Sequence, residues 1–155
     1  MNHIEPVKKQ ILVNAAREHA FKVFTAGIDR WWPREHHIGK SPLKEILIEQ
    51  RAGGRWYSLC EDGSECEVGK VLSWEPPGRL VLAWQINADW KYDPEFVTEV
   101  EVTFTALSVN QTEVVLEHRD LERFGERAAE LRKMIGSAGG WGKIMDEFAK
   151  SSEAA

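Results

Sequence analysis

Residues 96–107, FVTEVEVTFTAL, carry the pattern that most restricts the fold of this chain, because apolar and polar side chains alternate along them. Val102 and Phe104 fall on one side of an extended backbone, and Glu99 and Glu101 fall on the other. A period of two is typical of a β-strand with one buried face. We therefore expect a sheet with one face in water and the other covered by helices.

Other segments share this strand character and are separated by turn signals such as Asp62-Gly63 and Pro76-Pro77-Gly78. The further predicted strands span residues 6–13, 43–50, 55–60, 65–74, 79–86 and 112–121. Helices are predicted at 17–25, 126–135 and 138–150, with Ser137 as the N-cap of the last one. This order predicts an α+β fold in a single domain over residues 1–155, with a terminal helix on an antiparallel sheet.

Composition and charge exclude several classes of partner. The net charge is −5, from 20 basic and 25 acidic residues, and no basic cluster stands out. We therefore expect no nucleic-acid partner and no membrane partner. No apolar run approaches the roughly 20 residues that span a bilayer, and the start of the chain lacks the apolar core of a signal peptide. A cytoplasmic protein is expected, with Cys60 and Cys66 as free thiols.

Tryptophan is unusually frequent, with seven residues against two tyrosines. The strand alternation turns Trp84 toward the covering helix, and Trp56 is expected on the same face. Trp141 begins an apolar stripe that continues through Ile144 and Phe148 on the terminal helix. Large aromatic side chains can fill a core or line a cavity without filling it, and the residues alone leave both interpretations open.

His118 is the polar residue of greatest interest, because its strand parity turns it inward beside Leu116. It is either a buried histidine with hydrogen-bonded neighbours, or a polar anchor or general base inside an apolar pocket. Its burial favours the neutral imidazole. The sequence does not bring a partner within reach, although candidates for that role exist. These candidates are Asp120, Glu49, Arg51 and Glu65.

The pair His36-His37 lacks the spacing of a chelating site, so we expect a loop that could cover a cavity and no metal site. No nucleophile motif or phosphate loop is present, and no cofactor is expected. His118 is thus the one catalytic candidate.

Several segments, taken in order, resemble a known family. They are Trp31-Trp32-Pro33, GGRW at 53–56, EDGSE at 61–65, GKVLSWEPPGRLVLAW at 69–84, EVEVTF at 99–104, LEHRDLERFG at 116–125 and GGW at 139–141. Together they resemble a bacterial member of the START-like (SRPBCC) superfamily, in the branch named after the activator of the Hsp90 ATPase.

The resemblance implies a helix-grip fold, in which a curved antiparallel sheet grips a long C-terminal helix around an elongated cavity. It implies a protein that holds a hydrophobic or aromatic small molecule, with Trp56, Trp84, Phe104, His118 and Trp141 as the expected ligand-binding residues. The alternatives are a cyclase or hydrolase that uses His118 in the same cavity, and a co-chaperone-like interaction module with a link to the stress response. A homodimer and a chaperone contact are further expectations. The extra N-terminal domain of the eukaryotic co-chaperone is not expected in a chain of this length.

Overall fold

The computed structural model describes residues 4–153 apart from 35, 37–39 and 138, and this part of the chain forms seven strands and five helical segments. The strands are β1 Val7–Val13, β2 Leu43–Ile48, β3 Arg55–Cys60, β4 Glu65–Glu75, β5 Arg79–Trp84, β6 Thr98–Ser108 and β7 Gln111–Arg119. The helical segments are α1 Arg17–Phe24, α2 Ile28–Trp31, the 3-10 segment η1 Leu121–Arg127, α3 Ala128–Ile135 and α4 Trp141–Glu153.

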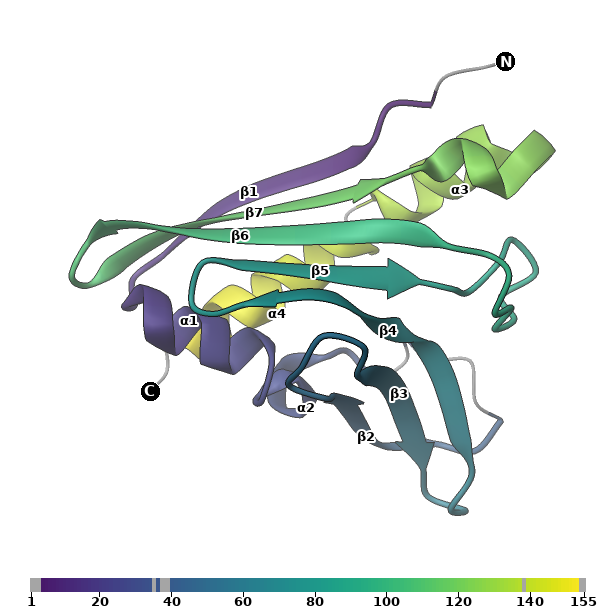
Figure 1. Ribbon diagram of the computed structural model, residues 1–155, viewed down its shortest axis with the longest axis horizontal. Helices are drawn as coiled ribbons and strands as arrows, with labels where there is room; N and C mark the ends of the chain where they lie inside the picture. The colour runs from purple at the N-terminus through teal and green to yellow at the C-terminus, as the bar shows by residue number, and fades with distance from the viewer. Residues whose placement is uncertain (1–3, 35, 37–39, 138, 154–155) are drawn as a thin grey trace.

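All seven predicted strands form, and they join one antiparallel sheet in the order β1-β7-β6-β5-β4-β3-β2. The first strand of the chain returns to pair with the last, because β1 lies beside β7 along its whole length. Figure 1 shows this arrangement, with α4 crossing the sheet on the side opposite the viewer. The expected α+β class and helix-grip architecture are confirmed.

The alternation that predicted the sheet also sets its register. Val100 pairs with His118, and Val102 pairs with Leu116, across β6 and β7. All four side chains are fully buried on the inner face. The predicted inward direction of His118 is therefore confirmed, and the outward side chains of the same strands remain partly in water.

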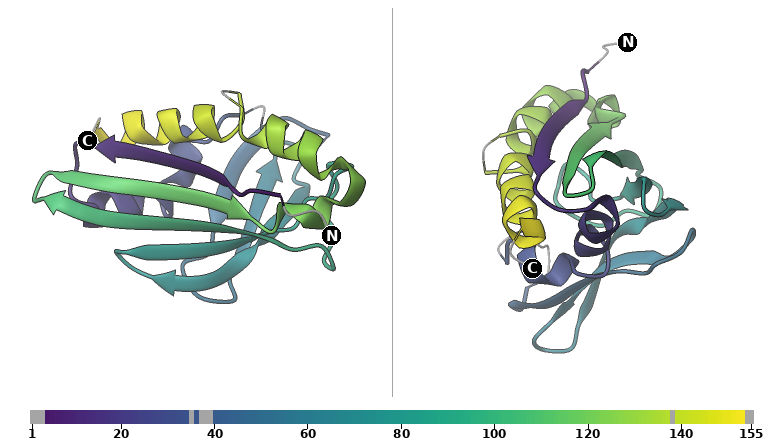
Figure 2. Two further views of the ribbon diagram at one scale, coloured as in Figure 1. Left: turned by 90° about the horizontal axis from the view of Figure 1, so that it is seen from above. Right: turned by 90° about the vertical axis from the view of Figure 1, so that its left-hand side faces the viewer.

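The sheet is strongly curved, and Figure 2 shows it curling around α4. Irregular register occurs between Trp56 and Tyr57 in β3, and between Val71 and Ser73 in β4. Such bulges bend a strand and increase its twist. The sheet therefore has a concave face, and α1, α2 and α4 lie on it, with α1 and α2 both in contact with α4.

The outer face of β6 and β7 carries a network of ion pairs. Arg119 binds Glu99 at 2.8 Å and Glu101 at 2.9 Å, and Arg79 binds Glu101 at 2.5 Å. Burial opposes ionisation of Glu101, but the hydrogen bonds from Arg79 and Arg119 outweigh it and lower the pKa of that carboxyl. The outer face thus carries charged side chains that form ion pairs with one another. The alternation in β6 predicts that this face is polar.

The start of the terminal helix differs from the prediction. We expected a helix from residue 138 with Ser137 as N-cap, but α4 begins at Trp141, and the Ser137 hydroxyl donates to the Met134 carbonyl at 2.7 Å. The chain turns tightly there, because a Cβ on Gly140 would lie 2.4 Å from the carbonyl oxygen of Ile135. Gly140 therefore packs against the end of α3.

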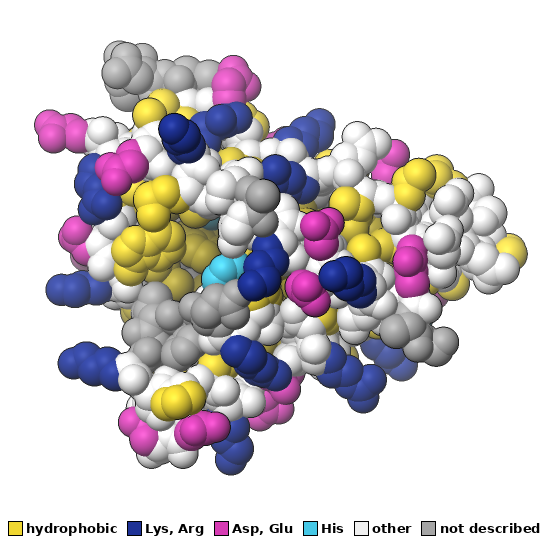
Figure 3. Space-filling model, turned by 180° about the vertical axis from the view of Figure 1, so that it is seen from behind, with side chains coloured by type: hydrophobic (Ala, Val, Ile, Leu, Met, Phe, Trp, Pro, Cys, Tyr) yellow, Lys and Arg dark blue, Asp and Glu magenta, His cyan; other side chains and the backbone are white. Residues whose placement is uncertain are grey.

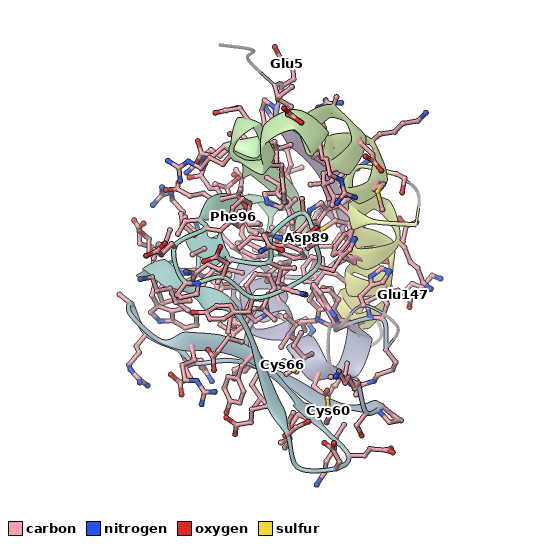
Figure 4. The ribbon with its side chains drawn as sticks, turned by 90° about the vertical axis from the view of Figure 1, so that its right-hand side faces the viewer. Glu5, Cys60, Cys66, Asp89, Phe96 and Glu147 are labelled. Carbon is pink, nitrogen blue, oxygen red and sulfur yellow. The ribbon has the colours of Figure 1, made fainter. Side chains whose placement is uncertain are left out.

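Figure 4 shows Cys60 and Cys66 on the β3–β4 hairpin, away from α3 and α4. Both are free thiols, as expected. Burial raises the pKa of the Cys66 thiol. Among the described residues, no helix combines the length and apolar character needed to cross a membrane.

Candidate functional site

One end of the interior, under α1 and the C-terminal half of α4, is filled by aromatic rings. Phe104 of β6 lies 5.2 Å from Phe21, 6.0 Å from Phe24 and 6.5 Å from Phe148, measured between ring centroids. Trp31 adds a further ring 5.3 Å from Phe148. We call these five residues the phenylalanine cluster. Its edge-to-face contacts are those that aromatic rings prefer in a close-packed core.

The other end is built from four tryptophans, which we call the tryptophan ring. Trp32 follows α2, Trp56 lies in β3, Trp84 ends β5, and Trp141 begins α4. Their ring centroids form a closed circuit with successive distances of 6.0 Å for Trp32–Trp56, 5.8 Å for Trp56–Trp84, 6.1 Å for Trp84–Trp141 and 6.2 Å for Trp141–Trp32. Residues from four separate elements therefore meet at one place.

A cavity of about 440 Å³ opens beside the tryptophan ring. Three of the four ring members line it, namely Trp32, Trp84 and Trp141, and Trp90 lines it from the β5–β6 loop. The remaining lining is aliphatic or backbone, with His36 as the one ionisable side chain among the described residues. These other lining residues are Ile86, Met134, Ile135, Gly139, Gly140 and Ile144. Figure 3 shows hydrophobic side chains gathered on this face of the molecule, with a histidine beside them.

Trp90 reaches the cavity because of an unusual loop conformation. Its backbone lies in the left-handed region with φ of 58°, which is rare for a bulky residue. The Asn87 side chain holds the loop by accepting hydrogen bonds from the amides of Asp89 and Lys91. Arg127 at the end of η1 also holds the loop, because its guanidinium donates to the Ala88 carbonyl at 2.9 Å. The side chain of Trp90 is 41% exposed, so it forms a rim of the cavity.

His118 links two walls of the cavity from behind. Trp141 Nε1–H donates to His118 Nδ1 at 3.1 Å, and His118 Nε2 lies 2.8 Å from Thr98 Oγ1. The Thr98 hydroxyl in turn donates to the Trp84 carbonyl at 3.2 Å. Because an indole N–H is a donor only, Nδ1 accepts and the imidazole proton lies on Nε2. The four groups thus form one hydrogen-bond chain with a single direction.

The electrostatics of His118 agree with this chain. Complete burial lowers the pKa of His118 from 6.5 to about 3. The ring is therefore neutral near pH 7, and its accepting lone pair is already used by Trp141. A general base needs that lone pair free and within reach of a substrate. The geometry favours a positioning role for His118 over the acid or base role.

The residues predicted for ligand binding fall into three groups. Trp84 and Trp141 line the cavity. Trp56 and His118 lie directly behind those walls, in contact with Trp84. Phe104 belongs to the phenylalanine cluster at the filled end.

Trp32 and Trp90 are cavity residues that are not among the ligand-binding residues expected from the sequence. From the sequence, the Trp31-Trp32-Pro33 turn could either close one end of a cavity or plug the first helices, and Trp90 falls in a loop. Trp90 carried no sequence signal of a cavity residue, because a single exposed hydrophobic side chain is common on protein surfaces. His36 lies at the cavity, as a covering loop would require, and His37 lies outside the described residues.

Among the described residues, no three histidine, cysteine, aspartate or glutamate side chains cluster as metal ligands would. What the described arrangement can do chemically is to enclose an apolar molecule between aromatic faces. It can also present the few polar groups that lie behind those faces.

Comparison with known proteins links this architecture to a family. The sequence model described as "Activator of Hsp90 ATPase homolog 1-like protein" matches residues 14–153. No curated protein sequence matches the chain. Among solved structures, the chain is similar to the anthrahydroquino-gamma-pyrone synthase Txn09, with 34% identity, 97% of this chain and 99% of that one covered, and a TM-score of 0.67.

Two further structures place the fold more firmly. CalC, a self-sacrificing resistance protein from Micromonospora echinospora, is 32% identical, with 99% of both chains covered and a TM-score of 0.70. The Aha1 dimer from Colwellia psychrerythraea is 15% identical, with 97% of this chain and 98% of that one covered and a TM-score of 0.64. This last similarity shows the fold alone.

Proposed function

This chain belongs to the family of Activator of Hsp90 ATPase homolog 1-like proteins, and on that premise we propose that it binds an uncharged hydrophobic or aromatic small molecule in the cavity beside the tryptophan ring. The observation that carries the proposal is the lining itself. Four tryptophans surround about 440 Å³, and no Lys, Arg, Asp or Glu is among the described lining residues. Cavities of this size and character are typical of small-molecule sites.

The energetics of the lining support a binder of flat apolar molecules. Burial of apolar surface contributes about 25 cal/mol per Å² removed from water. An indole face adds stacking preference for another aromatic ring. A charged ligand would lose its hydration here without an opposite charge in the described lining to compensate. The similarity to a synthase of an anthrahydroquino-gamma-pyrone and to a resistance protein supports the same class of ligand.

Equilibrium dialysis against 9-fluorenone, a neutral three-ring aromatic ketone, tests the proposal. We expect saturable binding of one probe per chain. Trp84→Ala removes a cavity wall and should weaken the affinity at least tenfold, about 1.4 kcal/mol. Trp74→Ala is the matched control, because Trp74 packs on Phe21 at the filled end, 5.1 Å between ring centroids. Equal losses in the two variants would contradict a defined cavity site.

An enzyme acting in the same cavity is the second candidate, and the similarity to the synthase supports it. His118 gives it little support, because both ring nitrogens are already hydrogen bonded. If the protein turns over a substrate and His118→Gln retains that turnover, the acid or base of the reaction is a group other than His118. The homodimer, the chaperone contact and the cytoplasmic location remain predictions.

A further inference from the structure

The lining of the cavity divides into a buried inner wall and an exposed rim. Five lining residues are each 7% exposed or less, and we call them the inner wall. They are Trp32, Ile86, Ile135, Trp141 and Ile144. Trp90 and Met134 line the same cavity but are 41% and 44% exposed, so water reaches this rim. A molecule in the cavity therefore has one side against buried side chains and one side toward water.

The described side chains of the inner wall leave no polar group for a ligand. Trp32 Nε1–H donates to the His36 carbonyl at 2.8 Å, and Trp141 Nε1–H donates to His118 Nδ1 at 3.1 Å. An indole has this one donor and no acceptor, and the other three members are isoleucines. A hydroxyl or carbonyl placed against this wall would give up its hydrogen bonds to water without gaining a side-chain partner.

His36 brings the ionisable side chain of the described lining to this cavity, and it is partly exposed. Its backbone is fixed at two points, because its amide donates to the Pro33 carbonyl at 3.0 Å and its carbonyl accepts from Trp32. The side chain therefore starts from a fixed place beside the inner wall. An imidazole can exchange hydrogen bonds with either a hydroxyl or a carbonyl.

We propose that the ligand is an aromatic molecule with a polar group at one end only, and that it binds in a single orientation, with its apolar end against the inner wall and its hydroxyl or carbonyl at the rim beside His36. This inference rests on the proposed binding function and names the ligand class and orientation at the same site.

The balance of burial and hydrogen bonding sets this orientation. The apolar end gains about 25 cal/mol for each Å² that the inner wall removes from water. The polar end loses little at the rim, because water and His36 both remain available there. Reversal of the molecule would leave its polar group unpaired in the buried part, which costs about 1–3 kcal/mol. A second polar group at the far end would carry the same cost in either orientation.

Three probes with the same ring system test the inference by equilibrium dialysis. They are fluorene, 2-hydroxyfluorene, which we call the one-ended probe, and 2,7-dihydroxyfluorene, which we call the two-ended probe. The hydroxyls are uncharged near pH 7, because phenols ionise near about pH 10. In wild type we expect the one-ended probe to bind at least as tightly as fluorene. The two-ended probe should bind at least about fivefold more weakly than the one-ended probe.

His36→Leu tests the partner at the rim. We expect the one-ended probe to lose about threefold to tenfold in affinity and fluorene to change by less than about twofold. His19→Leu is the matched control, because His19 lies in α1 and is not among the lining residues. It should leave the affinities of both probes unchanged.

The outcomes separate this inference from the proposed function. Equal affinities of the one-ended and two-ended probes, or equal responses of fluorene and the one-ended probe to His36→Leu, would overturn this inference while the proposed function stands. Failure of wild type to bind any of the three probes would overturn the proposed function and this inference with it.

A second measurement needs no variant to fold. Nuclear Overhauser contacts in the wild-type complex report which end of the one-ended probe lies where. We expect the ring that carries the hydroxyl to contact the Met134 methyl at the rim, and the other terminal ring to contact the Ile144 methyls at the inner wall. The reverse pattern, or both rings at both sites, would contradict a single orientation.

Discussion

The two ends of the interior use the same helix and the same sheet, yet one is filled and the other is hollow. The four phenylalanines of the phenylalanine cluster carry no polar side-chain atom, so their rings can approach from any side until the space is full. Trp31 is the one member of the cluster with a donor, which binds the Val23 carbonyl. Every member of the tryptophan ring carries an N–H, and in Trp32, Trp84 and Trp141 that N–H fixes the indole near a particular acceptor. Directional hydrogen bonds hold these rings apart in a set geometry, and a cavity remains beside them. The two ends therefore differ in how many of their aromatic side chains are held by a hydrogen bond.

The largest expected effect lies at the filled end. Phe148 is fully buried among the rings of the phenylalanine cluster. Phe148→Ala should lower the free energy of unfolding by about 3–5 kcal/mol, because the lost contacts leave a void that the rigid surroundings do not refill. Urea unfolding measures the change. Lys150→Ala, an exposed site on the same helix, should stay within about 0.5 kcal/mol. A small effect at Phe148 would mean that the filled end is loosely packed.

The next largest effect concerns how the free energy of unfolding depends on pH, through His118 at the hollow end. Burial lowers the pKa of His118 to about 3, while the unfolded chain has the ordinary value of 6.5. Between these values the unfolded chain binds the extra proton, so this stabilisation is complete above pH 6.5 and is lost as the pH falls. The loss should be about 1.4 kcal/mol per pH unit, or about 3 kcal/mol by pH 4.5.

His118→Gln removes this titration and isolates its contribution. The difference in unfolding free energy between wild type and His118→Gln should narrow as the pH falls below 6.5. Carboxylates such as Glu101 titrate in both proteins and cancel in the difference. Parallel stability curves in urea titrations from pH 7 to 4.5 would show that His118 does not stay neutral in the fold.

A smaller effect should follow from breaking one link behind the cavity. Trp141→Phe keeps an aromatic wall but leaves His118 Nδ1 as a buried acceptor without a donor. We expect Trp141→Phe to lower the free energy of unfolding by about 1–3 kcal/mol. Replacing both residues, in Trp141→Phe with His118→Leu, should cost less than the sum of the single changes. Additive costs in this double-mutant cycle, measured by urea unfolding, would mean that the two side chains are not coupled.

The smallest effect belongs to the outer face, which neither end of the interior touches. Arg119→Leu removes ion pairs to Glu99 and Glu101 whose side chains are partly in water. We expect the free energy of unfolding to fall by about 1 kcal/mol or less, and by less still at high salt. The affinity for 9-fluorenone should not change. A change in that affinity would show that the outer network shapes the cavity and would weaken the contrast between the two ends.

The sequence was sufficient for the parts of the fold that depend on local alternation. The period of two in β6 and β7 predicted the sheet, its solvated face and the inward direction of His118. Trp84 was placed toward the helix for the same reason. The phenylalanine cluster could not be told from a cavity wall, because Phe104 and Trp84 have the same parity and differ only in what lies opposite them.

The site depended on contacts between residues that are distant in the chain. Trp141 meets His118 because the first residue of α4 lies against the end of β7, and the sequence pattern of neither segment predicts that contact. Trp90 reaches the cavity because its own backbone is left-handed, and the sequence of a polar loop does not predict that conformation. Gly140 approaches the end of α3 closely just before α4 begins, and this contact between two segments is not predicted by the sequence pattern of either one.

The closed circuit of indoles also has an optical consequence. Four rings whose centroids lie 5.8 to 6.2 Å from their neighbours are close enough for their electronic transitions to couple. Excitation absorbed by one member spreads to the others before light is emitted, so the four residues behave as one chromophore. The strong indole transition lies in the far ultraviolet, so the far-ultraviolet circular dichroism of this protein should carry an exciton signal from this end of the interior. A molecule that touches a single indole of the circuit would alter the signal of all four.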